Sequence, residues 1–99
     1  MLGETLRRLR GIYGYNATEM SKLLGISNSY LSELERGKKK VSLDLLDRYA
    51  DVFGIRASTL MRFSEEYEGA VEQNRAQLFI TNMMSKLIEF YGERYEASD

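Results

Sequence analysis

Four polar residues between positions 28 and 33 have the types and the spacing needed to hydrogen-bond to the edges of nucleic-acid bases. On a helix they would start or line one outer face: Asn28, Ser29, Ser32 and Glu33. An asparagine amide can pair with adenine through two bonds, a carboxylate can accept from the cytosine amino group, and a serine hydroxyl can serve several bases. For Glu33 the alternative interpretation is a surface residue that merely repels nearby phosphate.

No set of residues for covalent or metal catalysis accompanies this group. The 99 residues include no histidine and no cysteine, so the usual zinc sites, thiol chemistry and the serine-histidine triad are all excluded. The carboxylates of the first half are interpreted as capping and solvated residues: Glu4, Asp44, Asp47 and Asp51. The sequence therefore predicts no enzyme, no metal site and no cofactor.

The base-reading group is preceded by a short helical pattern. Asn16 can cap this segment, and Glu19 stands where a capping-box acid would reach back, so the helix is expected to begin near Ala17. Gly25 supplies the left-handed residue that ends it.

A second helical pattern follows after a tight turn and contains the base-reading group. Ser27 can cap it, Leu31 and Leu34 form its inner stripe, and Gly37 closes it. Two short helices joined in this way match a helix-turn-helix motif, whose second helix lies in the major groove of DNA.

Over residues 2 to 62 the chain resembles the phage-repressor/Cro-like (XRE) family. The Leu-Gly-Ile-Ser turn at 24–27 and the Glu-Arg-Gly-Lys ending at 35–38 occur together at the separation typical of that family. Further positions match its spacings: Leu6, Arg7, Leu9, Arg10, Gly14, Tyr30, Leu46, Ala50, Gly54 and Leu60. The resemblance implies five helices, DNA binding as a dimer and, usually, transcriptional repression.

The resemblance also implies roles for individual residues. Arg10 and Glu35 match a partly buried ion pair that ties the scaffold together, and Asn16 matches a residue that touches phosphate as well as capping its helix. Ala17 departs from the family, which commonly has a DNA-contacting glutamine there. Ser21 replaces a usual alanine, and its hydroxyl can bond back to the carbonyl of Ala17.

Contacts to the DNA backbone are expected from the start of the motif, from its second helix and from the lysine run that follows: Asn16, Tyr30, Arg36, Lys38, Lys39 and Lys40. Such contacts supply affinity and register but no sequence information. Two alternatives stay open: the lysine run could be an ordinary solvated loop, and Tyr30 could pack sideways.

The whole pattern predicts an all-α fold, with a five-helix repressor-like DNA-binding domain at residues 1–63 and an added C-terminal helix within 64–99. Further helices are expected at about 2–13 and 43–53, followed by a short fifth helix capped by Ser58. Residues 1–63 carry eleven Lys/Arg and seven Asp/Glu, a net charge of +4, whereas residues 64–99 carry three and eight, a net charge of −5. The basic part is the one with the motif. Without a signal peptide or a long apolar run, the protein is expected to be cytoplasmic.

The C-terminal segment carries an apolar stripe at helical spacing. Its helix is expected to begin between Ser64 and Ala70 and to end near Gly92, with a frayed acidic tail after it. The width of the stripe predicts dimerisation through Phe79, Ile80, Met83, Met84, Leu87, Phe90 and Tyr91. The alternatives are packing on its own domain and recruitment of another protein.

These observations predict a small homodimeric regulator that binds double-stranded DNA sequence-specifically. It would most commonly be a repressor that occupies an inverted-repeat operator through the second motif helix. A protein of a different class is the alternative: an interaction module, antitoxin-like or regulator-binding, that grips a protein with its C-terminal helix.

Overall fold

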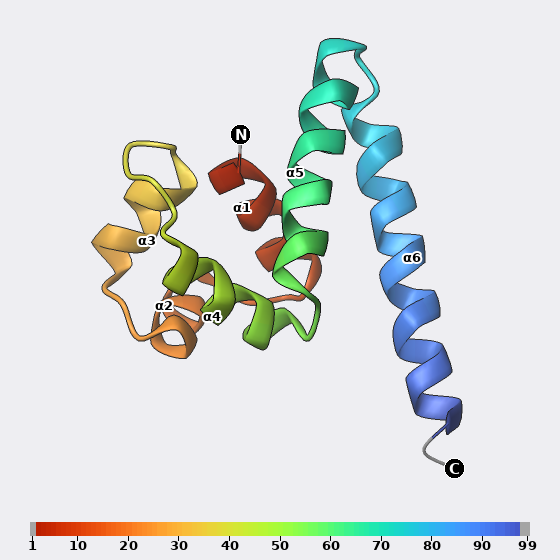
Figure 1. The fold of residues 1–99 in the computed structure, drawn as a ribbon, viewed down its shortest axis with the longest axis horizontal. Coiled ribbons are helices and arrows are strands. Elements are labelled where there is room, and N and C mark those ends of the chain that lie inside the picture. Colours follow the sequence, from red (N-terminus) through yellow and green to blue (C-terminus); the bar gives the residue numbers. More distant parts are fainter. Residues whose placement is uncertain (1, 98–99) are drawn as a thin grey trace. The chain divides into compact units, whose positions relative to one another are not determined.

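A computed structural model describes residues 2–97, with side chains described through residue 89, and the regular structure of this part is helical throughout (Figure 1). The helices are α1 (Leu2–Ile12), α2 (Ala17–Leu24), α3 (Asn28–Glu35), α4 (Leu43–Phe53), α5 (Ala57–Glu72) and α6 (Ala76–Ala97). The predicted all-α class is confirmed. The chain divides into two compact units, residues 1–65 and 66–99.

The core of the first unit is built from one apolar stripe on each of its helices. Buried side chains recur three or four residues apart, which places them on one face of each helix. They include Leu6, Leu9, Met20, Leu24, Leu31, Leu34, Leu45, Leu46, Tyr49, Phe53 and Leu60. Burial of one such leucine contributes on the order of 1.5–3 kcal/mol, so these stripes hold the helices of the motif in place.

The predicted starts of α3 and α4 are confirmed by their caps. The side chain of Ser27 accepts the backbone N–H of Tyr30 at 3.1 Å, and α3 begins at the next residue. Ser42 accepts the N–H of Leu45 at 3.1 Å in the same way, and α4 begins after it.

A glycine lets α1 and α3 approach closely. Gly3 is buried, and a Cβ built on it would collide with the carbonyl oxygen of Leu34. Because any larger residue would push the two helices apart, Gly3 determines how deeply α3 sits against α1.

The expectation of a short fifth helix capped by Ser58 is wrong, because α5 begins at Ala57, has Ser58 inside it and extends over 16 residues. Leu60, Phe63 and Tyr67 are all buried and follow one another at helical spacing. This buried stripe continues α5 past Ser64. It therefore occupies the segment in which the sixth helix was predicted to begin.

The sixth helix begins at Ala76, later than predicted. The backbone of Asn74 has a φ of 59°, the left-handed conformation that asparagine tolerates better than most residues. Its N–H donates to the carbonyl of Val71 at 3.1 Å, and the N–H of Arg75 donates to that of Ala70 at 2.6 Å. This is a Schellman-type helix end, with asparagine in the place usually taken by glycine.

The end of α6 is also later than predicted, at Ala97 instead of near Gly92. A single glycine inside a helix costs only about 1 kcal/mol relative to alanine, which is too little to stop a helix whose other residues favour it.

The second unit contains the C-terminal part of α5 and the whole of α6. The rings of Tyr67 and Phe79 lie 5.8 Å apart between their centroids, which joins the two helices near the turn. Met83 and Leu87 are buried, while Leu78, Met84 and Ile88 are exposed. Among the described residues, no helix is long and apolar enough to cross a membrane.

Candidate nucleic-acid interface

The outer face of α3 presents the four side chains predicted to read bases. Asn28 and Ser29 are exposed and Ser32 and Glu33 are half-buried, whereas the opposite side of the helix is buried in the core. The helix is only eight residues long, so all four lie within little more than one turn and a half. The face therefore offers amide, hydroxyl and carboxylate groups to one ligand surface.

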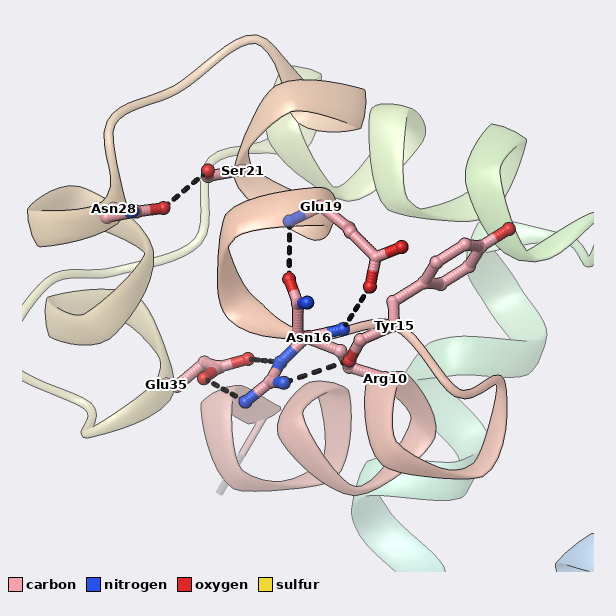
Figure 2. Close-up of polar contacts among 7 residues, drawn as sticks. All are labelled: Arg10, Tyr15, Asn16, Glu19, Ser21, Asn28 and Glu35. Atoms are coloured by element: carbon pink, nitrogen blue, oxygen red, sulfur yellow. Dashed lines mark hydrogen bonds and ion pairs between the residues drawn. The ribbon is translucent and has the colours of Figure 1, made fainter.

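Asn16 and Glu19 form a complete capping box at the start of α2 (Figure 2). The Asn16 side chain accepts the backbone N–H of Glu19 at 2.8 Å, and the Glu19 carboxylate accepts the N–H of Asn16 at 2.9 Å. The capping role predicted for Asn16 is confirmed, and α2 begins at Ala17 as expected. A phosphate contact by Asn16 stays a prediction.

Arg10 and Glu35 meet between α1 and α3, as the resemblance implies. Their side chains are only 17% and 8% exposed, and Arg10 Nε lies 2.8 Å from Glu35 Oε2 (Figure 2). The hydrogen bond to Glu35 raises the pKa of Arg10, although burial opposes the rise. The guanidinium therefore stays charged and holds α3 against α1.

The lysine run leaves α3 through a tight turn. Gly37 has a φ of 77°, and the N–H groups of Lys38 and Lys39 donate to the carbonyl of Glu33 at 2.9 and 3.3 Å. All three lysines are exposed, and their ammonium groups form no ion pair with another described residue. The backbone bonds thus keep three free positive charges at the end of α3.

A hollow of about 450 Å³ lies between α1, α2 and α3. Its walls are formed by Glu4, Arg7, Arg10, Ala17, Asn28, Ser32, Glu35 and Arg36. Ala17 carries too short a side chain to fill it. Arg7 and Arg36 are exposed at its border, and Arg7 had not been predicted as a site residue, although its position one turn before Arg10 was a usable signal.

Asn28 also contacts α2, which the sequence did not predict. Its side-chain oxygen lies 2.6 Å from Ser21 Oγ (Figure 2), and its side-chain nitrogen lies 3.4 Å from Thr18 Oγ1. Ser21 Oγ lies 2.9 Å from the carbonyl oxygen of Thr18. The expected bond from Ser21 to Ala17 is wrong: a helical serine can reach the third or the fourth residue back, and the rotamer that meets Asn28 reaches Thr18.

The residues of α6 that were predicted to form the dimer interface differ in their exposure to solvent. Met83 and Leu87 are 2% and 7% exposed within the single chain, Phe79 and Ile80 are half-buried, and Met84 is 42% exposed. The side chains of Phe90 and Tyr91 lie outside the described residues. Among the described side chains, no acidic cluster is placed to hold a metal ion.

Known proteins share the pattern of the first unit. A family model described as helix-turn-helix matches residues 6–60. The HTH-type transcriptional regulator SinR of Bacillus subtilis is 27% identical over 88 residues, which cover 86% of this chain and 79% of SinR. The HTH-type transcriptional regulator DdrOP3 of Deinococcus deserti is 35% identical over 81 residues, 78% of this chain and 63% of DdrOP3.

An archaeal protein shares a shorter segment. A Pyrococcus furiosus protein named "Putative HTH-type transcriptional regulatory protein" is 41% identical over 51 residues, which cover 52% of this chain. That segment is only 16% of the length of the archaeal protein. The likeness to it is therefore confined to the part that carries the motif.

Proposed function

Because the chain belongs to the XRE-type helix-turn-helix family of DNA-binding transcriptional regulators, we propose that it acts as a homodimeric repressor that occupies an inverted-repeat operator. The observation that carries this proposal is the outer face of α3, where exposed hydrogen-bonding side chains lie beside an exposed lysine run. A surface of this kind matches the two requirements of sequence-specific DNA binding, base contacts and phosphate contacts.

Base reading is assigned to the outer face of α3. With this helix in the major groove, Asn28 at its first turn and Glu33 further along it would meet different base pairs. Ser29 and Ser32 lie beside them and can serve more than one base. Asn28, Ser29 and Ser32 have short side chains, so the helix must approach the bases closely.

Phosphate contacts are assigned to groups around this helix: Asn16, Tyr30, Arg36, Lys38, Lys39 and Lys40. Asn16 stands at the N-terminus of α2, where free N–H groups and the helix dipole favour an anion. Arg7 joins this set because it is exposed at the border of the hollow beside Arg36.

The dimer is assigned to α6. Since Met83 and Leu87 are already buried in one chain, the surface offered to a second copy is the neighbouring exposed face that carries Met84 and Ile88. Two copies related by a two-fold axis would present two α3 helices to one face of the duplex. The half-site centres would then lie about 34–36 Å apart, one turn of DNA.

Selection from genomic DNA fragments followed by sequencing tests this function. The expected result is an enriched inverted repeat whose affinity falls by about three to five decades between 50 and 200 mM salt, for roughly 6 to 10 neutralised phosphates per dimer. Selection of no sequence, together with binding that ignores salt, would contradict the proposal and favour the protein-interaction module instead.

A further inference from the structure

We propose that Ser21, on α2, is a positioning residue that fixes the orientation of the Asn28 amide and thereby the base that Asn28 selects. The inference rests on the proposed function, in which Asn28 reads a base. Ser21 itself is only 4% exposed, so its hydroxyl cannot serve as a DNA contact. Its influence on DNA must therefore pass through Asn28, whose side chain lies 2.6 Å away.

The hydrogens available to the three side chains decide how this amide is turned. The Ser21 hydroxyl has one hydrogen, and the carbonyl oxygen of Thr18, 2.9 Å away, can only accept. The contact with the Asn28 side-chain oxygen is shorter, at 2.6 Å, and has the length of an O–H···O bond, so the Ser21 hydroxyl donates to the amide oxygen. The amide nitrogen then faces Thr18 and donates to its hydroxyl oxygen across 3.4 Å.

The opposite orientation of the amide fits these distances less well. With the amide nitrogen toward Ser21, an N–H···O bond would have to span 2.6 Å, below the range of about 2.7–3.2 Å that is usual for such bonds. The amide oxygen would then depend on the Thr18 hydroxyl across 3.4 Å, longer than O–H···O bonds usually are. The distances therefore favour oxygen toward Ser21 and nitrogen toward Thr18.

The orientation matters because Asn28 can contact a base only with the amide hydrogen-bonding groups that do not face α2. One N–H and one oxygen lone pair face α2, and one of each remains for DNA. Paired contact with adenine requires an acceptor opposite its amino group and a donor opposite N7, in that order along the groove. A half-turn of the amide reverses the order, so Ser21 determines which arrangement of adenine Asn28 accepts.

A measurement without DNA tests the orientation. Nuclear magnetic resonance would follow the chemical shifts and the solvent exchange of the two Asn28 side-chain N–H protons in wild type, Ser21→Ala and Thr18→Val. We expect Thr18→Val to speed the exchange of one proton, because its acceptor is lost. We expect Ser21→Ala to shift both protons, because the amide loses the donor that holds its oxygen. Ser58→Ala, which removes an exposed hydroxyl from α5, is the matched control.

Faster exchange of one proton in Ser21→Ala, with both protons unchanged in Thr18→Val, would overturn the proposal, since it would place the nitrogen toward Ser21. Equal spectra in all four proteins would overturn it as well. Thermal unfolding of each variant shows that it is folded. Ser21→Ala removes one buried atom and leaves a residue that favours helices.

Operator binding tests the consequence for specificity. Suppose that the wild type binds an operator with the preferred base pair opposite Asn28 about tenfold more tightly than one with another base pair. Ser21→Ala should then reduce this affinity ratio toward about twofold and leave the salt dependence of binding unchanged. In an Asn28→Ala background, Ser21→Ala should have no further effect on base preference. An effect of the same size in that background, or an unchanged preference in Ser21→Ala, would overturn the positioning role. Failure of the wild type to select any operator would instead contradict the proposed function.

Discussion

Arg10 and Glu35 form two parallel hydrogen bonds that join α1 to α3 across 25 positions of sequence. Nε donates to Oε2 at 2.8 Å and Nη2 donates to Oε1 at 3.1 Å. The remaining guanidinium nitrogen, Nη1, donates to the carbonyl of Tyr15 at 3.0 Å. One side chain thus connects α1, the segment that leads into α2, and α3.

Replacement of Arg10 by lysine tests this connection. An ammonium group keeps the charge but cannot make two parallel bonds to one carboxylate. We expect Arg10→Lys to lower the free energy of unfolding by about 1.5–3 kcal/mol, measured by chemical denaturation. The control is Asp44→Asn, which breaks an exposed pair with Arg48 and should cost no more than about 1 kcal/mol. Equal losses would mean that the Arg10 pair is no stronger than a surface pair.

Two glycines of α1 should respond in opposite ways to alanine. At Gly3 the new methyl group would meet the carbonyl of Leu34, so Gly3→Ala should destabilise the protein by about 1–3 kcal/mol. At Gly11 nothing lies within reach, so Gly11→Ala should stabilise it by about 0.5–1 kcal/mol through helix propensity. Thermal unfolding of both variants measures the difference. Similar melting temperatures would show that α1 and α3 are not closely apposed at Gly3.

Two buried or half-buried tyrosines differ in whether the hydroxyl has a partner. Tyr49 is buried and its hydroxyl has no hydrogen-bond partner among the described residues, whereas the Tyr13 hydroxyl donates to the carbonyl of Phe53 at 2.7 Å. Tyr49→Phe should therefore leave stability unchanged or raise it, while Tyr13→Phe should lower it by about 0.5–1.5 kcal/mol. A large loss in Tyr49→Phe would reveal a partner for that hydroxyl.

Tyr49 should also affect the stability of the protein at alkaline pH. Burial raises the pKa of Tyr49. Because the folded state keeps the neutral phenol, this stabilisation is complete below the ordinary tyrosine pKa and is lost as the pH rises toward the raised value. The wild type should lose stability above about pH 10, and Tyr49→Phe should lose less of it. Denaturation curves at pH 8 to 11 give the comparison, and parallel losses would contradict the role of Tyr49.

The lysine run should control the salt dependence of DNA binding but not its sequence preference. If each lysine neutralises one phosphate, alanine at Lys38, Lys39 and Lys40 should flatten the slope of log affinity against log salt by up to about 5 per dimer. Lys86→Ala, an exposed change on α6, should leave the slope as it is. An unchanged slope in the triple variant would remove the loop from the interface.

The exposed face of α6 should hold the dimer together. Lysine at both Met84 and Ile88 would bring unpaired charges into the proposed contact, so sedimentation should show folded monomers with much weaker operator binding. Since both side chains are exposed in one chain, the substitutions need not disturb its own fold. Val71→Lys on α5 is the control, because it also replaces an exposed apolar side chain by lysine. A folded dimer in the double variant would place the interface elsewhere.

The sequence by itself determined the motif and the starts of α2, α3 and α4, since these depend on contacts between near neighbours. The caps at Asn16, Ser27 and Ser42 each join a side chain to an N–H three residues later, so their partners can be identified without any tertiary structure. The prediction of a short α5 was wrong for a related reason. Its true end depends on Asn74 in a left-handed conformation, and asparagine is a weaker signal for that conformation than glycine.

The tertiary structure decided which side chains from different helices meet. The turn between α2 and α3 brings Ser21 against Asn28, and no helical spacing within either helix indicates this contact. The same holds for the burial of Met83 and Leu87 within one chain, because an apolar stripe shows only that a face must be covered. Periodicity reports which face of a helix is apolar, and packing alone selects the surface that covers it.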